Sequence, residues 1–111
     1  MNPNIKTGTV EGTGSAINVA LGFQPDHVRI FNIDATNPVS VEWTSDMDDG
    51  HGLKLKGGTV AYSKITSNGI TPYDGADNDE GYGFTIGADS DLNVNNQTLV
   101  YVATRSGAGA A

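Results

Sequence analysis

The sequence of 111 residues contains no cysteine. This absence excludes thiol catalysis, disulfide bonds and cysteine-based zinc sites. Basic residues are also scarce, because six Lys and Arg stand against 13 Asp and Glu, which gives a formal net charge of −7. Contacts to phosphate groups need Lys and Arg, and the six basic residues form no stripe, so we expect no nucleic-acid partner.

Long apolar stretches are missing as well. No segment approaches the roughly 20 apolar residues of a membrane-spanning helix, and residues 1–14 lack the basic and apolar pattern of a secretory signal. We therefore expect no membrane partner. No segment sustains a helical period of 3.6 residues, which argues against amphipathic helices.

Glycine, with 15 residues, and short runs of β-branched residues are abundant instead. Turn residues interrupt these runs at intervals of roughly eight to twelve residues, which is typical of a β-sandwich or barrel. The clearest strand is residues 39–44, where Val39, Val41 and Trp43 alternate with polar residues. Because Trp43 is in phase with the two valines, we expect it in the core. Further strands are predicted at residues 15–21, 27–33, 53–56, 59–66, 82–86 and 98–104.

Two of these strands have apolar side chains on both faces. Residues 27–33 and 98–104 are therefore predicted to be central strands that are covered on both sides. Residues 53–56 are predicted to form a short edge strand guarded by Lys54 and Lys56. The segment Ser67-Asn68-Gly69 predicts a tight turn.

The chain is long enough for one domain with a hydrophobic core. We predict an all-β, single-domain antiparallel β-sandwich, jelly-roll-like, with seven or eight strands in residues 15–105. Residues 5–10 are a first strand or part of an extended N-terminal arm, which we assign to residues 1–14. Residues 106–111 are expected to be a flexible tail.

Nine of the 13 acidic residues lie in the segments 46–49, 74–80 and 89–91. Asp89, Asp91 and Asn93 match the start of a calcium-binding loop. Val94 then replaces the glycine of the sharp turn, and Val100 replaces the bidentate glutamate. Asp and Asn favour turns because they bond to their own backbone, so we expect ordinary turns here, with no metal and no other cofactor.

No catalytic arrangement emerges from the sequence. His27 and His51 lack metal-ligand spacing, and no Gly-x-Ser-x-Gly elbow accompanies them. A pair of carboxylates for glycoside hydrolysis is possible by number alone, but a domain of this size has little room for a substrate cleft. The glycines of residues 8–14 precede an alternating strand rather than a helix, which argues against a phosphate loop. We therefore predict that the chain is not an enzyme and assign no catalytic residue.

Aromatic residues leave one alternative open. Tyr73 and Tyr82 flank an acidic segment, and together with Tyr62 and Trp43 they are candidates for a sugar-binding platform. A carbohydrate-binding module is therefore a second alternative function.

The order of elements resembles a known family. Residues 14–33 combine an alternating strand, a Gly-Phe-Gln-Pro-Asp turn and an apolar strand, which is similar to the opening of many small phage structural proteins. The segments 41–50, 83–89 and 99–105 resemble the same group. Over about residues 12–105 the chain thus resembles the capsid decoration (cement) proteins of tailed bacteriophages.

This resemblance implies a virion structural protein that is made in the bacterial host cytoplasm. It implies binding to the outside of the assembled head, where a homotrimer stabilises the lattice of the major capsid protein. A tail, baseplate or fibre-associated protein is the first alternative. The resemblance supplies no catalytic residues. Separately, the polar composition around Ile5 and Val10 suggests contact with the capsid or a neighbouring subunit by strand addition.

Overall fold

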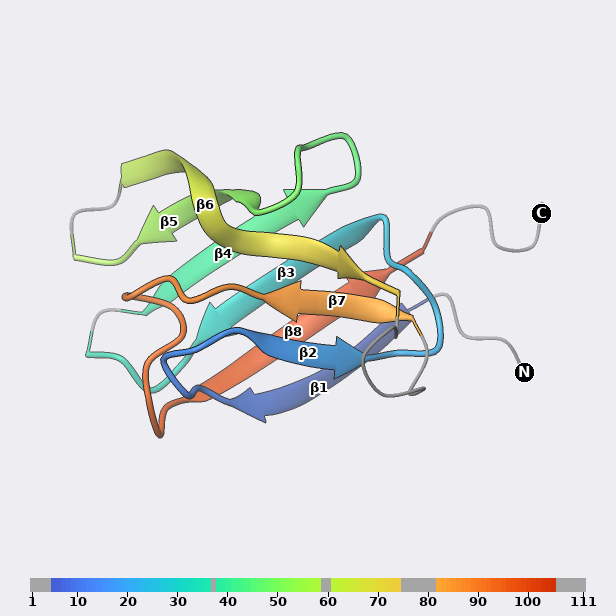
Figure 1. Ribbon diagram of the computed structural model, residues 1–111. Coiled ribbons are helices and arrows are strands. Elements are labelled where there is room, and N and C mark those ends of the chain that lie inside the picture. Colours follow the sequence, from blue (N-terminus) through green and yellow to red (C-terminus); the bar gives the residue numbers. More distant parts are fainter. Residues whose placement is uncertain (1–4, 37, 59–60, 75–81, 106–111) are drawn as a thin grey trace.

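The computed structural model describes residues 5–36, 38–58, 61–74 and 82–105. These residues form eight β-strands and no helix, which confirms the predicted all-β, single-domain fold (Figure 1). No helix long and apolar enough to cross a membrane occurs in these ranges. The strands are β1 (Ile5–Glu11), β2 (Ile17–Ala20), β3 (His27–Asn32), β4 (Val39–Thr44), β5 (His51–Lys56), β6 (Ala61–Tyr73), β7 (Gly83–Ile86) and β8 (Thr98–Thr104).

All eight strands belong to one antiparallel sheet in the order β1-β8-β3-β4-β5-β6-β7-β2. The sheet curls so that β7 and β2 lie over the face formed by β3 and β8 (Figure 1). The first half of β6 pairs with β5 and its last residues pair with β7. The arrangement agrees with a sandwich, with the difference that β6 joins the two layers into a continuous sheet.

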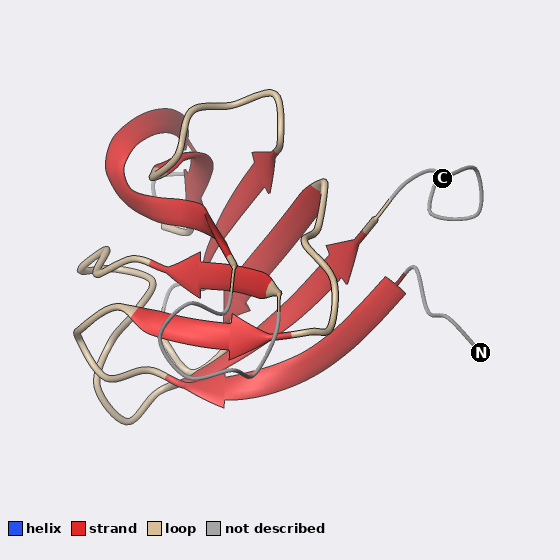
Figure 2. Cartoon of the chain, turned by 45° about the vertical axis from the view of Figure 1, so that its right-hand side comes forward, coloured by secondary structure: helices blue, strands red, loops and turns tan. Residues whose placement is uncertain are grey.

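A bend inside β6 makes this connection, and it is seen as the long curled strand at the upper left of Figure 2. Gly52 faces Ile65 whereas the adjacent His51 faces Ile70, so residues 66–69 are looped out of the ladder between these pairs. Asn68 has a φ of 62°. The Ser67–Gly69 turn signal therefore bends a strand instead of closing a hairpin, and the strand predicted at 59–66 continues to Tyr73.

Residues 5–10, predicted to be a first strand or part of an arm, lie in a strand at one edge of the sheet. Residues 5–11 form β1 and pair with β8 from Ile5↔Thr104 to Glu11↔Thr98. This pairing satisfies backbone groups of β8 that would otherwise face solvent. The predicted edge strand at 53–56 is wrong, because β5 lies between β4 and β6. The sheet therefore begins ten residues earlier than the boundary at residue 15.

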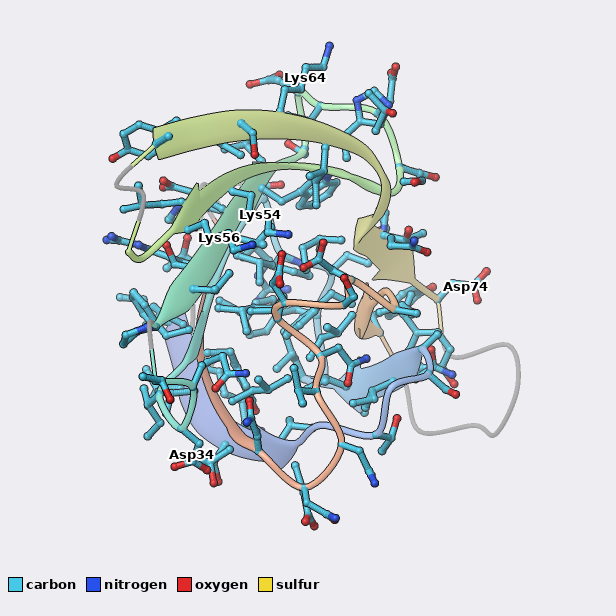
Figure 3. The ribbon with its side chains drawn as sticks, turned by 90° about the vertical axis from the view of Figure 1, so that its left-hand side faces the viewer. Asp34, Lys54, Lys56, Lys64 and Asp74 are labelled. Atoms are coloured by element: carbon cyan, nitrogen blue, oxygen red, sulfur yellow. The ribbon has the colours of Figure 1, made fainter. Side chains whose placement is uncertain are left out.

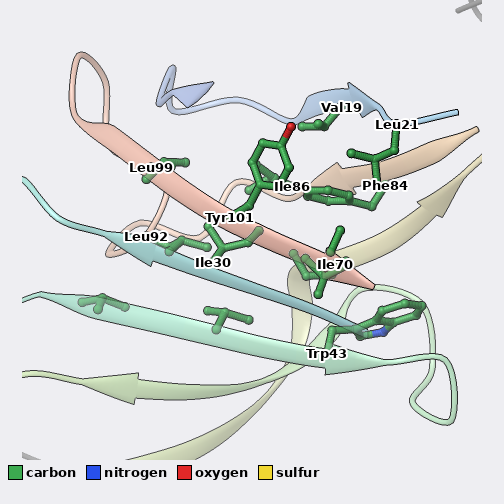
Figure 4. Packing of buried hydrophobic residues seen from close by; sticks show 14 of the residues in the cluster. Val19, Leu21, Ile30, Trp43, Ile70, Phe84, Ile86, Leu92, Leu99 and Tyr101 are labelled. Carbon is green, nitrogen blue, oxygen red and sulfur yellow. The ribbon is translucent and has the colours of Figure 1, made fainter. Parts of the chain in front are cut away.

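The core lies between the two layers and receives alternate side chains from β3, β4 and β8 (Figure 4). Trp43 is 1% exposed, which confirms its predicted core position. The rings of Phe84 and Tyr101 meet edge to face with centroids 5.4 Å apart, which joins β7 to β8 across the layers. The predicted tail at 106–111 and most of the acidic segment 74–80 lie outside the described residues.

Candidate interaction surface

The outward side chains of the layer β1-β8-β3-β4-β5 are unusually apolar. Cross-strand partners in a sheet point to the same face, and the register places five residues in line across β8, β3, β4, β5 and β6. All except Ser40 are large apolar or aromatic residues. We call this line the outer row, and it consists of Val100, Phe31, Ser40, Leu55 and Tyr62.

A parallel line, the second row, carries three charged residues of this face. It consists of Val102, Arg29, Glu42, Leu53 and Lys64. The Arg29 guanidinium stacks over the Phe31 ring at 4.9 Å from its centroid, and Glu42 Oε2 lies 2.5 Å from His27 Nε2. Within the described residues, no carboxylate lies within ion-pair distance of Arg29 or Lys64.

A groove of about 340 Å³ lies at Phe31, Ser40 and Leu55 of the outer row. Pro38 also lines it, and so do two cations, Arg29 and Lys56. The groove is therefore largely apolar and is lined by positive but no negative side chains. We refer to it as the outer groove.

The prediction that β3 and β8 are covered on both sides is wrong for the described residues. Their inward side chains are buried, but Phe31, Val100 and Val102 on the outward side are only partly covered. Beside them Leu53 and Tyr62 are 37% and 68% exposed. Both faces of β3 and β8 do carry apolar side chains, but within the described residues a second layer covers only the inward face.

The two residues expected to contact a capsid are separated by the strand pleat. Ile5 is 62% exposed, whereas Val10 packs against the core. Ile5 stays a candidate for contact, but Val10 belongs to the folded domain. The far edge of β1 has no strand partner among the described residues, so strand addition there stays a prediction.

The acidic residues that resembled a calcium loop converge on a lysine. Lys54 Nζ lies 3.0 Å from Asp89 Oδ1 and 2.7 Å from Asp91 Oδ2, and Lys56 Nζ is 3.5 Å from the same Asp91 oxygen. Figure 3 shows Lys54 and Lys56 together beside the 87–97 loop. The side chains of Lys54 and Asp89 are each 10% exposed. The ion pairs thus hold the loop against β5. In the described ranges, no group of three or more His, Asp or Glu could hold a metal ion.

Two buried asparagines also hold the 87–97 loop in place, a role that the sequence did not reveal. Asn93 Oδ1 accepts hydrogen bonds from the backbone N–H groups of Thr13 and Gly14, while its Nδ2 donates to the carbonyl oxygens of Ser15 and Gly87. Asn32 Nδ2 donates to the carbonyl oxygen of Leu92 and to Gln97 Oε1. The only sequence signal for Asn32 was its phase with the apolar residues of β3. Asn93 was read as part of the calcium-like pattern.

The ion pairs shift two pKa values. The hydrogen bond from Lys54, with smaller contributions from both lysine charges, lowers the pKa of Asp91 below its ordinary 3.8. Burial by itself lowers the pKa of Lys54, but the hydrogen bonds and charges of Asp91 and Asp89 outweigh burial and raise it above 10.5. Lys54 and Asp91 are therefore both charged around neutral pH.

A pH prediction follows for Asp91. Its pKa is lower in the folded than in the unfolded chain, so its stabilisation is complete above pH 3.8 and is lost as the pH falls through the lower folded pKa. We expect Asp91→Asn to destabilise the protein at neutral pH and to differ from wild type progressively less below about pH 4. Urea unfolding of both proteins across this range measures the difference. A difference that stays constant down to about pH 2 contradicts the ion pair.

Other predicted candidates are not brought together into a site. Trp43 and Tyr73 are 1% and 6% exposed, so neither contributes to a sugar platform. His51 Nε2 lies 4.0 Å from the exposed Asp48 carboxylate, on another part of the sheet from His27. Gly8, from the glycine-rich segment, lies in β1 against the Tyr101 ring, where a Cβ would approach the ring hydroxyl to 2.7 Å. This segment is therefore part of a strand rather than a phosphate loop.

Comparison of the chain with family models, curated proteins and solved structures finds no significant match.

Proposed function

We propose that this chain is a non-catalytic virion structural protein that binds the outside of an assembled phage head and stabilises the lattice of the major capsid protein. The sequence resemblance motivates the proposal. The observation that carries it is the outer row, a line of apolar side chains that the described fold leaves partly uncovered. Partly exposed apolar surface of this kind is typical of sites that bind other proteins, which supports the proposal.

The physical basis of such a function is thermodynamic linkage between binding of this protein and assembly of the shell. A protein that binds the assembled lattice better than separate subunits adds its binding free energy to the stability of the shell. Many copies on a repeated lattice each need only a modest interface, because linked sites act together. We propose a homotrimer as the bound form, made in the host cytoplasm and located on the capsid surface.

The rest of the fold is suited to this passive role. The 87–97 loop is held by the buried Lys54–Asp89 pair and by Asn32 and Asn93. A binding module held rigid in this way loses little conformational entropy when it docks. A carbohydrate-binding role has less support, since Trp43 and Tyr73 are buried in the fold.

Copy number in purified virions tests the proposal. We expect quantitative mass spectrometry to find hundreds of copies in simple proportion to the major capsid protein, as repeated lattice sites demand. A few copies, near the low symmetry numbers of a tail or vertex, would move the protein to the tail or baseplate. Absence from virions would refute both locations.

A further inference from the structure

The charges that line the outer groove differ in sign from the charge of the whole molecule. The chain has a net charge of −7, yet the groove is lined by two cations, Arg29 and Lys56, and by no Asp or Glu. Lys56 Nζ lies 3.5 Å from Asp91 Oδ2, whereas Arg29 has no ion-pair partner among the described residues. Arg29 therefore provides an uncompensated positive charge beside the groove.

Arg29 is positioned to bind an anion beside the groove. Its guanidinium stacks on Phe31, and both residues border the outer groove. A guanidinium that rests on an aromatic face keeps its N–H edge available, and this planar edge matches a carboxylate. Leu55, across Ser40 from Phe31 in the outer row, supplies the opposite apolar wall. The groove thus offers an apolar slot with a carboxylate-binding group at its rim.

We propose that the outer groove binds an acidic segment of the partner protein that inserts one apolar side chain between Phe31 and Leu55 and places a carboxylate on Arg29. This inference rests on the proposed function, in which the outer face docks on the head, and it specifies the chemistry of the docked segment. Lys56, which also lines the groove, adds a second positive charge beside the docked segment. Charge complementarity selects an acidic partner over a basic one.

Binding to heads assembled without this chain tests the inference. We expect Arg29→Glu to weaken co-sedimentation with heads by roughly tenfold, and wild-type binding to weaken between about 0.05 and about 0.5 M NaCl. Lys6→Glu is the matched control, because it changes the net charge equally from an exposed position on β1. Melting temperatures near that of wild type show that each variant is folded.

The outcomes separate this inference from the proposed function. Equal binding by Arg29→Glu and Lys6→Glu overturns the inference while leaving head binding intact. If Arg29→Glu instead abolishes self-association in analytical ultracentrifugation and leaves head binding unchanged, a second copy occupies the groove and the inference is wrong.

If wild type does not bind heads, the proposed function fails and a second measurement decides the inference. A short synthetic peptide with one Leu between Glu residues should shift the amide NMR signals of Phe31 and Leu55, which line the groove. The same peptide with Lys in place of Glu should not. Absence of shifts with the acidic peptide overturns the inference.

Discussion

Replacement of Asn93 by alanine is expected to lower the free energy of unfolding by about 3 kcal/mol. The Asn93 side chain makes four hydrogen bonds to backbone groups, two to the 13–14 segment and one each to Ser15 and Gly87. Asn93 is 1% exposed, so these groups lose their partners where water has little access. For a domain of this size the loss corresponds to a fall in melting temperature of roughly 15 °C.

Asn95→Ala is the matched control for this prediction. Asn95 lies in the same loop and is exposed, so the same chemical change there should alter stability by less than about 0.5 kcal/mol. Thermal unfolding followed by circular dichroism measures both variants. Equal melting temperatures for the two would show that Asn93 does not hold the loop.

Replacement of Lys54 by methionine is expected to destabilise the protein by about 3 kcal/mol. Methionine preserves the apolar stem of Lys54 but removes the ammonium, which leaves the Asp89 carboxylate 10% exposed without its cation. Breaking a buried pair on one side is destabilising because the remaining charge stays desolvated. Urea unfolding of the variant and wild type at neutral pH measures the loss.

Two further variants identify the cause. Adding Asp89→Asn to Lys54→Met should recover much of the stability, because asparagine is neutral. Its carbonyl oxygen can still accept hydrogen bonds from the backbone N–H groups of Asp91 and Leu92. Lys56→Met should cost less than about 1 kcal/mol, since Lys56 is 51% exposed. No recovery in the double variant would mean that packing of Lys54, rather than charge, is what stabilises the loop.

Some strands were predictable from the sequence with their bounds. Residues 39–44 and 98–104 have the predicted bounds in the structure. In residues 39–44 the period of two also fixes which side chains enter the core, whereas residues 98–104 are apolar on both faces. Strand order was not predictable in the same way. The pairing that puts β5 inside the sheet and β1 at its edge depends on partners distant in sequence.

The structural roles of polar residues were even harder to predict from the sequence than the strand order. Lys54 was expected to guard an edge, and its burial depends on Asp89, 35 residues later in the chain. Asn68 was correctly expected to leave the ordinary strand conformation, but a local turn signal does not reveal whether the chain reverses or only bends. For the candidate site, the apolar outward residues of β3 and β8 were visible in the sequence. Their alignment with Leu55 and Tyr62 required the register.

The pairing of β1 with β8 also has a consequence for how the protein is made. Ile5 is synthesised about one hundred residues before its partner Thr104, and β8 is also the strand that separates β1 from β3. The first strand therefore has no place in the sheet until the last strand has left the ribosome. Contacts so distant in sequence slow folding, so a chain stalled before β8 would leave the edges of β1 and β3 open to pairing with other nascent chains.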